Sequence, residues 1–355
     1  MQLVPADLLH RQITLVLASW GMDQDQVEIT AKVMVDTDLR GVDSHGISMV
    51  PVYADWLKRG WLTLPAPITV ASETPATAVV DAGHGLGHAP SVKAMELAIA
   101  KAKALGLAAA VVRNSTHYGA AGYYPRLAAA AGLMGWCVTN GQSKWVMPTF
   151  GAEPRFGTNP IAFAAPAKAE PPFVLDMATT TVAVGKIRNA AIERRAIPEG
   201  WATDAAGKPT TDGHIAYNGG SATPLGGTPE RSSHKGYGLA VMVEILSALL
   251  SGGTACPLSP KVAPDGHGLD NGHFMLVVDP KAFRPDGGFP GELDRLMISL
   301  RGTRPIDPKQ PVLVAGDKEE KSATARAKTG IPVPPGLMAE VKKTCEAAGA
   351  KFLLG

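Results

Sequence analysis

Apolar residues recur every three or four positions over the first part of the chain. Leu9 and Ile13 open a stripe of apolar side chains at helical spacing, which predicts an amphipathic helix over residues 6–20. A second helical pattern ends near Leu39, and a third is stopped by Gly60. We therefore expect the N-terminal part of the chain to be a helical unit.

The pattern changes after the Pro-rich segment 64–67. Short runs of Val and Ala, such as residues 77–81, now alternate with helical patterns, as in proteins that pack helices against a β-sheet. We predict an α/β (α+β) chain with two domains. Residues 1–75, joined by about 300–355, form the helical domain, and residues 76–299 form the α/β domain.

A glycine-rich turn follows the strand predicted at 77–81 and is similar to a dinucleotide-binding loop. His88 stands where that loop needs a third glycine, and the next strand ends in Arg113 rather than in an acidic residue that would hold a ribose. We interpret the glycines as a tight strand-to-helix turn and do not predict a Rossmann fold. Further along, residues 197–225 are rich in Gly, Pro, Thr and Asp and predict a long surface loop.

Composition and charge exclude several classes of protein. With 45% hydrophobic and 19% charged residues, the chain is expected to be globular rather than disordered. Its 34 basic and 32 acidic residues include no long run of like charge, so nucleic acid is not an expected partner. The most apolar helical candidate, Leu239–Leu250, is too short to span a bilayer.

The three cysteines, Cys137, Cys256 and Cys345, lie far apart and form no Cys-x-x-Cys pair. This spacing argues against disulfides and a thiolate zinc site, and it favours a reducing compartment. The N-terminal residues contain no basic segment followed by an apolar one, so we expect no secretory signal. We predict a cytoplasmic protein with no bound metal and no membrane partner.

The segment Asp38–Gly46 concentrates ionisable and hydroxyl side chains at the end of the second predicted helix. Ser44 and His45 lie outside any apolar run, so packing explains them poorly, and histidine is the residue most often used as a general acid or base near neutral pH. Arg40, Gly41 and Asp43 have a second interpretation, as the end of the helix and its turn, and that alternative stays open.

Two further segments place hydroxyls and backbone N–H groups at the start of a predicted helix, where an anion can bind. The first is residues 114–122, in which a hydroxyl alternatively serves only as a helix cap. In the second, Lys186 and Arg188 lie near a helix start, which is the unfavourable end for a cation. A compensating anion is expected there, supplied either by Asp176 or by a bound ligand.

Together these segments resemble the malate/L-lactate dehydrogenase family, a group of oxidoreductases without a Rossmann fold. The similar strings are Arg40–Gly46, His117–Ala121, Gly157–Pro160, Asp176–Ile187, His234–Gly236 and the segment around Gly316. The resemblance implies a largely antiparallel or mixed sheet domain with helices, plus a helical domain from both ends of the chain. It also implies a homodimer that reversibly reduces a 2-oxo acid to a 2-hydroxy acid, with NAD or NADP as cofactor.

The resemblance assigns a role to residues in each string. His45 is expected to donate or accept the proton, and Ser44 to form a hydrogen bond that orients the reacting groups. Lys186 is expected to stabilise charge on the substrate. Substrate binding is expected of Arg40, Thr158, Asn159 and Arg188. Cofactor binding is expected of His117, Tyr118, Gly119, Ala120, Ala121, Asp176, Met177, Ala178, Thr179, His234, Lys235, Gly316 and Asp317.

The chain departs from the family pattern at two places. Met49 stands where many members carry an arginine that binds the substrate carboxylate, so the substrate need not be malate or lactate. Either the substrate is less acidic or another cation binds its carboxylate. The other cations available are Arg188, Arg40 and Lys186. Ala315 and Asp317 replace residues of a Pro-Gly-Glu string that is common beside the cofactor.

Three other functions stay open from the sequence. One is an NAD(P)H-dependent reductase of a cyclic imino acid or a diketo acid; Lys186 disfavours the imine because some imine-reducing members carry Asp there. Another is a metal-dependent hydrolase, although the chain has no His-Glu-x-x-His or paired-cysteine spacing. Its candidate ligands are Asp43, His45, His84, His88 and His117. The last is a small-molecule binding protein that keeps the fold without catalysis.

Overall fold

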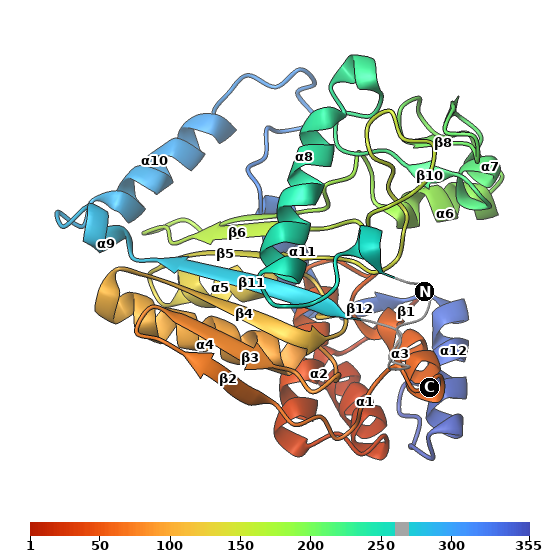
Figure 1. The fold of residues 1–355 in the computed structure, drawn as a ribbon, viewed down its shortest axis with the longest axis horizontal. Helices are drawn as coiled ribbons and strands as arrows, with labels where there is room; N and C mark the ends of the chain where they lie inside the picture. The colour runs from red at the N-terminus through yellow and green to blue at the C-terminus, as the bar shows by residue number, and fades with distance from the viewer. Residues whose placement is uncertain (260–269) are drawn as a thin grey trace. The chain divides into compact units, whose positions relative to one another are not determined.

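The structure, a computed structural model, describes residues 1–259 and 270–355 (Figure 1). Its internal contacts divide the chain into two compact units. Unit 1 consists of Met1–Cys137, Ala162–Asp176 and Met275–Gly355. Unit 2 consists of Val138–Ile161 and the described residues of Met177–Phe274.

The helical part of unit 1 joins the two ends of the chain. Strand β1 (Gln2–Val4) pairs antiparallel with β12 (Ile331–Val333). The buried Gln12 of α1 donates to the Lys351 carbonyl at 3.1 Å and accepts the Leu353 N–H at 2.6 Å. The helices here are α1 (Ala6–Ser19), α2 (Gln24–Leu39), α3 (Val50–Lys58), α11 (Asp317–Thr329) and α12 (Pro335–Ala347). The three predicted N-terminal helices are confirmed.

The rest of unit 1 is organised by the strands of a seven-stranded sheet, in the order β2-β3-β4-β11-β5-β6-β7. Strands β2 and β3 are antiparallel while β3 and β4 are parallel, so the predicted mixed sheet is confirmed. The strands are β2 (Thr69–Glu73), β3 (Thr77–Asp81), β4 (Leu107–Ser115), β5 (Met134–Thr139), β6 (Ile161–Ala165), β7 (Phe173–Met177) and β11 (Asn271–Val278). The helices added to them are α4 (His88–Leu105), α5 (Tyr123–Ala130), α9 (Pro280–Phe283) and α10 (Phe289–Arg301).

Helix α4 connects the parallel strands β3 and β4 and packs on both (Figure 1). This β-α-β unit accounts for the likeness of the sequence to a dinucleotide-binding fold. Because the next strand, β2, runs antiparallel, the sheet is not of the doubly wound parallel type. The turn before α4 is tight, as predicted: a Cβ at Gly85 would overlap the side chain of Ala66.

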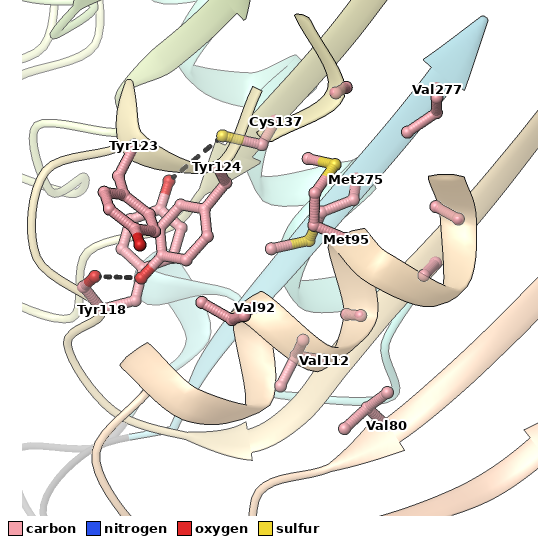
Figure 2. Packing of buried hydrophobic residues seen from close by; sticks show 14 of the residues in the cluster. Val80, Val92, Met95, Val112, Tyr118, Tyr123, Tyr124, Cys137, Met275 and Val277 are labelled. Atoms are coloured by element: carbon pink, nitrogen blue, oxygen red, sulfur yellow. Dashed lines mark hydrogen bonds between the residues drawn. The ribbon is translucent and has the colours of Figure 1, made fainter. Parts of the chain in front are cut away.

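The larger core of unit 1 lies between α4 and the sheet (Figure 2). Val80 of β3, Val112 of β4 and Met275 of β11 pack with Met95 of α4, and all four side chains are buried. Because close-packed side chains leave little room for rearrangement, this cluster fixes the position of α4 on the sheet.

Unit 2 is built from short elements around its own core. The prediction of a plain surface loop over residues 197–225 is wrong, because this segment buries Ile197, Ala202 and Ala216 and contains a three-stranded sheet. Its frequent Gly and Pro divide it into short elements without exposing it. The elements of unit 2 include α6 (Val184–Ile192), β8 (Ala202–Thr203), β9 (Pro209–Thr210), α7 (Gly213–Tyr217), β10 (Ser221–Ala222) and α8 (His234–Val243).

The predicted apolar helix of unit 2 is α8, which continues as a π-helical turn over Glu244–Leu249. The carboxylate of Glu244 is buried there and accepts hydrogen bonds from Asn159 and from the Cys256 N–H, both at 2.9 Å. Across the described ranges, every helix falls short of the length or the apolar character needed to cross a membrane.

We expect Met95→Ala to lower the free energy of unfolding by about 2–5 kcal/mol, because the substitution leaves a cavity between α4 and the sheet. Urea denaturation monitored by circular dichroism measures the change. Leu105→Ala, at the exposed end of the same helix, is the matched control and should cost less than about 1 kcal/mol. Equal losses in the two variants would contradict the assignment of this core.

Candidate active site

The turn that carries Ser44 and His45 is fixed by a buried carboxylate. Asp38, in the last turn of α2, is 2% exposed and accepts the Ile47 N–H at 2.8 Å. The backbone passes so close that a Cβ at Gly46 would overlap this carboxylate, which is why glycine is required. Burial raises the pKa of Asp38 to about 7, against the opposing effect of the hydrogen bond from Ile47.

Helix α11 holds the same turn from the C-terminal part of the chain. Arg326 donates to the Asp38 carbonyl at 2.6 Å and also pairs with the Asp43 carboxylate. Ser322 donates to the carbonyl of Leu39 at 3.1 Å. The turn is therefore supported by residues nearly the whole chain length away, and Asp43 belongs to that support.

Ser44 and His45 form a hydrogen-bonded pair at the end of this turn. The Ser44 hydroxyl lies 2.7 Å from His45 Nδ1. The imidazole is half-buried, and burial lowers the pKa of His45 below its usual value. A neutral imidazole with a hydroxyl partner can both take up and release a proton, which suits a general acid and base.

Two more imidazoles lie near His45 within unit 1. The ring of His117, two residues beyond β4, has its centroid 5.2 Å from that of His45. Tyr53 of α3 forms a hydrogen bond with His117 Nδ1 at 2.7 Å. His88, at the start of α4, is fully buried with its ring centroid 5.8 Å from that of Tyr53. Burial lowers the pKa of His88 to about 3, so its imidazole is neutral.

A carboxylate of unit 1 occupies the anion position predicted at the start of α5. Gly122 donates its N–H to Asp176 Oδ2 at 2.6 Å. Burial raises the pKa of Asp176 to about 6. The alternative that a hydroxyl caps this helix is wrong, since α5 has no side-chain cap and Thr116 donates instead to the Gly85 carbonyl at 3.0 Å.

Two segments predicted to bind cofactor meet at a cavity of about 270 Å³ in unit 1. Asp176 lines it from β7 and Gly316 from the residues before α11, with Lys318 and Glu319 on the same side. The Asp317 carboxylate already has partners in unit 1. It pairs with Arg301 and accepts the Val314 N–H at 2.8 Å. The departure from the family string at this residue therefore has a structural role, which is to hold the turn before α11. The remaining cofactor candidates on this side, Tyr118, Gly119, Ala120 and Ala121, form the chain between His117 and Gly122.

In unit 2 the structure brings together the segments predicted around Thr158 and Thr179. The Thr158 carbonyl accepts the N–H of Thr179 at 3.0 Å and its hydroxyl at 3.2 Å. Asn159 is fully buried at a φ of 39°, and its amide is bound to Gly141, Ala240 and Glu244. The Asn159 side chain thus braces this loop from the inside. Met177 and Ala178 directly precede Thr179 in the chain.

The cations predicted in unit 2 lie at the starts of two helices. Lys186 and Arg188 are exposed on α6, and neither has an ion-pair partner among the described residues of this unit. His234 and Lys235 are exposed at the start of α8, where a Cβ at Gly236 would overlap the backbone of Leu225. Unpaired cations at the positive end of a helix favour a bound anion.

Three candidate ligands of a metal-dependent hydrolase, His45, His88 and His117, lie near one another. Within the described ranges, no group of three or more His, Cys, Asp and Glu side chains could hold a metal ion. Asp43 is paired with Arg326, and His117 is bonded to Tyr53. These side chains make their hydrogen bonds within the protein.

Sequence reasoning missed two residues of the site. Tyr53 lies on the buried face of α3 and follows the spacing of a core residue, so no sequence pattern singles it out. Arg326 is one of many charged residues on α11 and looks like part of a solvated face. Their partners come from distant segments, and only the fold shows them.

Comparisons with known proteins agree with this arrangement. The sequence profile described as malate/L-lactate dehydrogenase matches residues 4–342. The chain is 38% identical to the malate dehydrogenase of Pyrococcus horikoshii, over 99% of this chain and 96% of that protein. It is 37% identical to the L-sulfolactate dehydrogenase of Methanocaldococcus jannaschii, over 94% of each chain. The crystal structure of malate dehydrogenase from Entamoeba histolytica, 32% identical, superposes with a TM-score of 0.92 over 99% of both chains.

We expect Asp38→Asn to flatten the pH dependence of stability. The carboxyl of Asp38 holds its proton more tightly in the folded chain than in the unfolded one, so stability is lost as pH rises from about 4 to about 7. The Asn variant does not ionise at this position. Between about pH 5 and about pH 8, its free energy of unfolding should therefore fall by roughly 2–3 kcal/mol less than that of the wild type.

Urea denaturation at several pH values measures this difference. Asp25→Asn, on the exposed first turn of the same helix, is the matched control and should follow the wild type. Parallel pH profiles of the wild type and Asp38→Asn would show that this carboxylate is not the group that titrates.

Proposed function

Because this chain belongs to the malate/L-lactate dehydrogenase family of NAD(P)-dependent enzymes that act on CH–OH groups, we propose that it interconverts a 2-hydroxy acid and the corresponding 2-oxo acid, with His45 as the proton donor and acceptor. The observation that carries the proposal is the Ser44–His45 pair on a turn that the adjoining Asp38 and the distant helix α11 hold in place. A fixed turn keeps the imidazole in one position for proton transfer.

The proton chemistry follows from the surroundings of His45. When bound, a reduced nicotinamide cofactor would supply the hydride for the carbonyl carbon of the substrate. As the electron pair of the C=O bond moves to oxygen, that oxygen takes the proton from the protonated His45. In the reverse direction His45 accepts the hydroxyl proton, and the Ser44 hydroxyl can serve either state because it both donates and accepts.

The cations of α6 are the candidates for binding the negative charge of the substrate. In this proposal Lys186 stabilises the carbonyl oxygen and Arg188 binds the carboxylate, since neither is paired within the described residues of unit 2. Arg40, which the sequence also offers for the carboxylate, is a weaker candidate because it is already paired. Asp36 and Glu320 lie 3.3 Å and 2.9 Å from its guanidinium nitrogens. Met49 is half-buried against the helical core of unit 1 and supplies no charge.

The residues that would hold the cofactor have suitable chemistry in each unit. Unit 1 offers the cavity lined by Asp176 and Gly316, with polar atoms for a nucleoside. Unit 2 offers His234 and Lys235 at the start of α8, where a cation and helix N–H groups suit a phosphate. Separate titrations with NADH and NADPH, followed by nicotinamide fluorescence, decide which cofactor binds.

We also propose that the protein is a homodimer. Leu296 and Leu300 lie about one turn apart on α10 and are each about half exposed, and apolar side chains on one face of a surface helix are typical of a protein interface. Sedimentation velocity of the purified chain measures the oligomeric state. A cytoplasmic location stays a prediction from the cysteine pattern.

We expect His45→Asn to lower kcat by a factor of about 10²–10⁴, because the reaction loses its proton donor while the substitution keeps a polar side chain of similar size. Consumption of NADH or NADPH with a panel of 2-oxo acids measures kcat. Cofactor affinity from the fluorescence titration should stay close to that of the wild type.

The control for this variant is His10→Asn, which removes a surface histidine paired with Glu28 at 3.2 Å and should leave turnover unchanged. Near-normal turnover of His45→Asn would remove His45 from the chemical step. A wild-type protein that binds neither cofactor would reject the dehydrogenase proposal itself.

We expect Arg188→Gln to raise KM for the 2-oxo acid by about 10–100-fold with a smaller effect on kcat, because a charge-assisted bond to the carboxylate is lost. The initial rate as a function of substrate concentration measures both constants. Arg195→Gln, which removes an exposed arginine paired with Glu193 in the same segment, is the matched control. If both variants change KM equally, the carboxylate is bound elsewhere.

A further inference from the structure

Two imidazoles of unit 1, those of His88 and His117, contact the phenol of Tyr53, and a third, that of His45, contacts His117. The ring of Tyr53 has its centroid 5.8 Å from that of His88 and 6.0 Å from that of His117. His117 in turn lies 5.2 Å from His45, centroid to centroid. The proposed reaction needs one proton carrier, so something must distinguish these histidines from one another.

The hydrogen bonds of His117 fix which of its nitrogens carries the proton. Its Nδ1 atom receives the backbone N–H of Gly119 at 3.3 Å and lies 2.7 Å from the Tyr53 hydroxyl. A backbone N–H can only donate, so Nδ1 has to be an unprotonated acceptor. The phenol must then be the second donor, and the ring proton of His117 belongs on Nε2.

This arrangement opposes a second proton on His117. An imidazolium carries N–H groups at both nitrogens, and a proton on Nδ1 would face the Gly119 N–H, which has no way to become an acceptor. Two hydrogen bonds would be lost in a half-buried position, and an unsatisfied donor there is costly. Tyr53 stays a donor throughout, because burial raises the pKa of this phenol well above its usual value.

The other two histidines have different surroundings. His88 is fully buried, and neither of its ring nitrogens has a hydrogen-bond partner in the described part of the chain, so protonation there has nothing to stabilise it. His45 is bonded at Nδ1 to the Ser44 hydroxyl, which can reverse its role from donor to acceptor. His45 can therefore change its protonation state without losing this bond.

We propose that Tyr53 is a positioning residue that, together with the Gly119 amide, holds His117 as a neutral imidazole protonated at Nε2, and so leaves His45 as the one histidine of the cluster that exchanges a proton in the reaction. The assignment to the reaction rests on the proposed function. The protonation state of His117 is a property of the protein alone and can be tested without a substrate.

The position of Tyr53 suits this role. Its side chain is fully buried on α3, with the ring of Trp56 at 5.5 Å and that of His88 at 5.8 Å between centroids. A phenol packed between rings has few alternative rotamers, so its hydroxyl stays directed at His117. Among the residues that the structure describes, the titratable rings closest to His117 are His45 on the turn, Tyr53 on α3 and His88 on α4.

The first experiment is nuclear magnetic resonance of the protein labelled with ¹⁵N-histidine. Long-range ¹H–¹⁵N correlations distinguish protonated from unprotonated ring nitrogens, and the His117 signals are identified by their loss in His117→Gln. We expect wild-type His117 to show an unprotonated Nδ1 and a protonated Nε2, unchanged between about pH 6 and about pH 8. A protonated Nδ1, or uptake of a second proton in this range, would overturn the proposal.

Tyr53→Phe tests the part played by the phenol, because it removes the hydroxyl and keeps the packed ring. We expect the His117 signals of this variant to move with pH, while those of Tyr123→Phe, a buried tyrosine of α5 without a bond to His117, match the wild type. Identical spectra for Tyr53→Phe and the wild type, or equal changes in both variants, would contradict a specific role for Tyr53.

Kinetics supply the functional readout. Tyr53→Phe should lower kcat by about tenfold, the loss expected from one hydrogen bond, with KM for the 2-oxo acid within about twofold of the wild type. Its kcat should also fall more steeply toward acid pH, because His117 then takes up a proton near His45. An unchanged kcat and pH profile would overturn the positioning role. A wild-type protein inactive on every 2-oxo acid would reject the proposed function, and the resonance experiment would still decide the state of His117.

Discussion

The burial of one carboxylate determines where the proposed proton carrier lies. Asp38 lies buried in the last turn of α2, and the chain turns so closely around it that position 46 must be glycine. A buried carboxylate is costly unless it is hydrogen-bonded, and the Ile47 N–H meets part of that need. Arg326 adds a second support through the Asp38 carbonyl. Ser44 and His45 have little freedom because the residues on both sides of them are held.

Burial disfavours the charged form of His45 and of His88, so these two rings are favoured as neutral imidazoles. The hydrogen-bond partners of His45 and His117 differ in one property, which is whether the partner can both donate and accept. A backbone N–H cannot, whereas a serine hydroxyl can. That difference separates His117, bonded to Gly119, from His45, bonded to Ser44.

The cations of the two units differ in whether a carboxylate of the same unit pairs with them. Arg40, Arg301 and Arg326 of unit 1 each pair with a carboxylate and hold helices or turns together. Lys186 and Arg188 lie at the start of α6 without such a partner among the described residues of unit 2, where the helix dipole makes a cation unfavourable. Unpaired charges of this kind point to a bound anion, consistent with a carboxylate substrate.

Local sequence determined the N-terminal helices, the tight turn before α4 and the segments that carry the candidate site residues, because helical spacing, glycine and reactive side chains act over a few residues. It also identified the family, through strings distributed along the chain. The inner structure of residues 197–225 was decided by tertiary packing, since small residues reveal their burial only once a core forms around them. The same holds for Tyr53, Arg326 and the Asp176 carboxylate at the start of α5. Their roles depend on partners far away in the chain, and a sequence pattern carries no information about which distant residues meet.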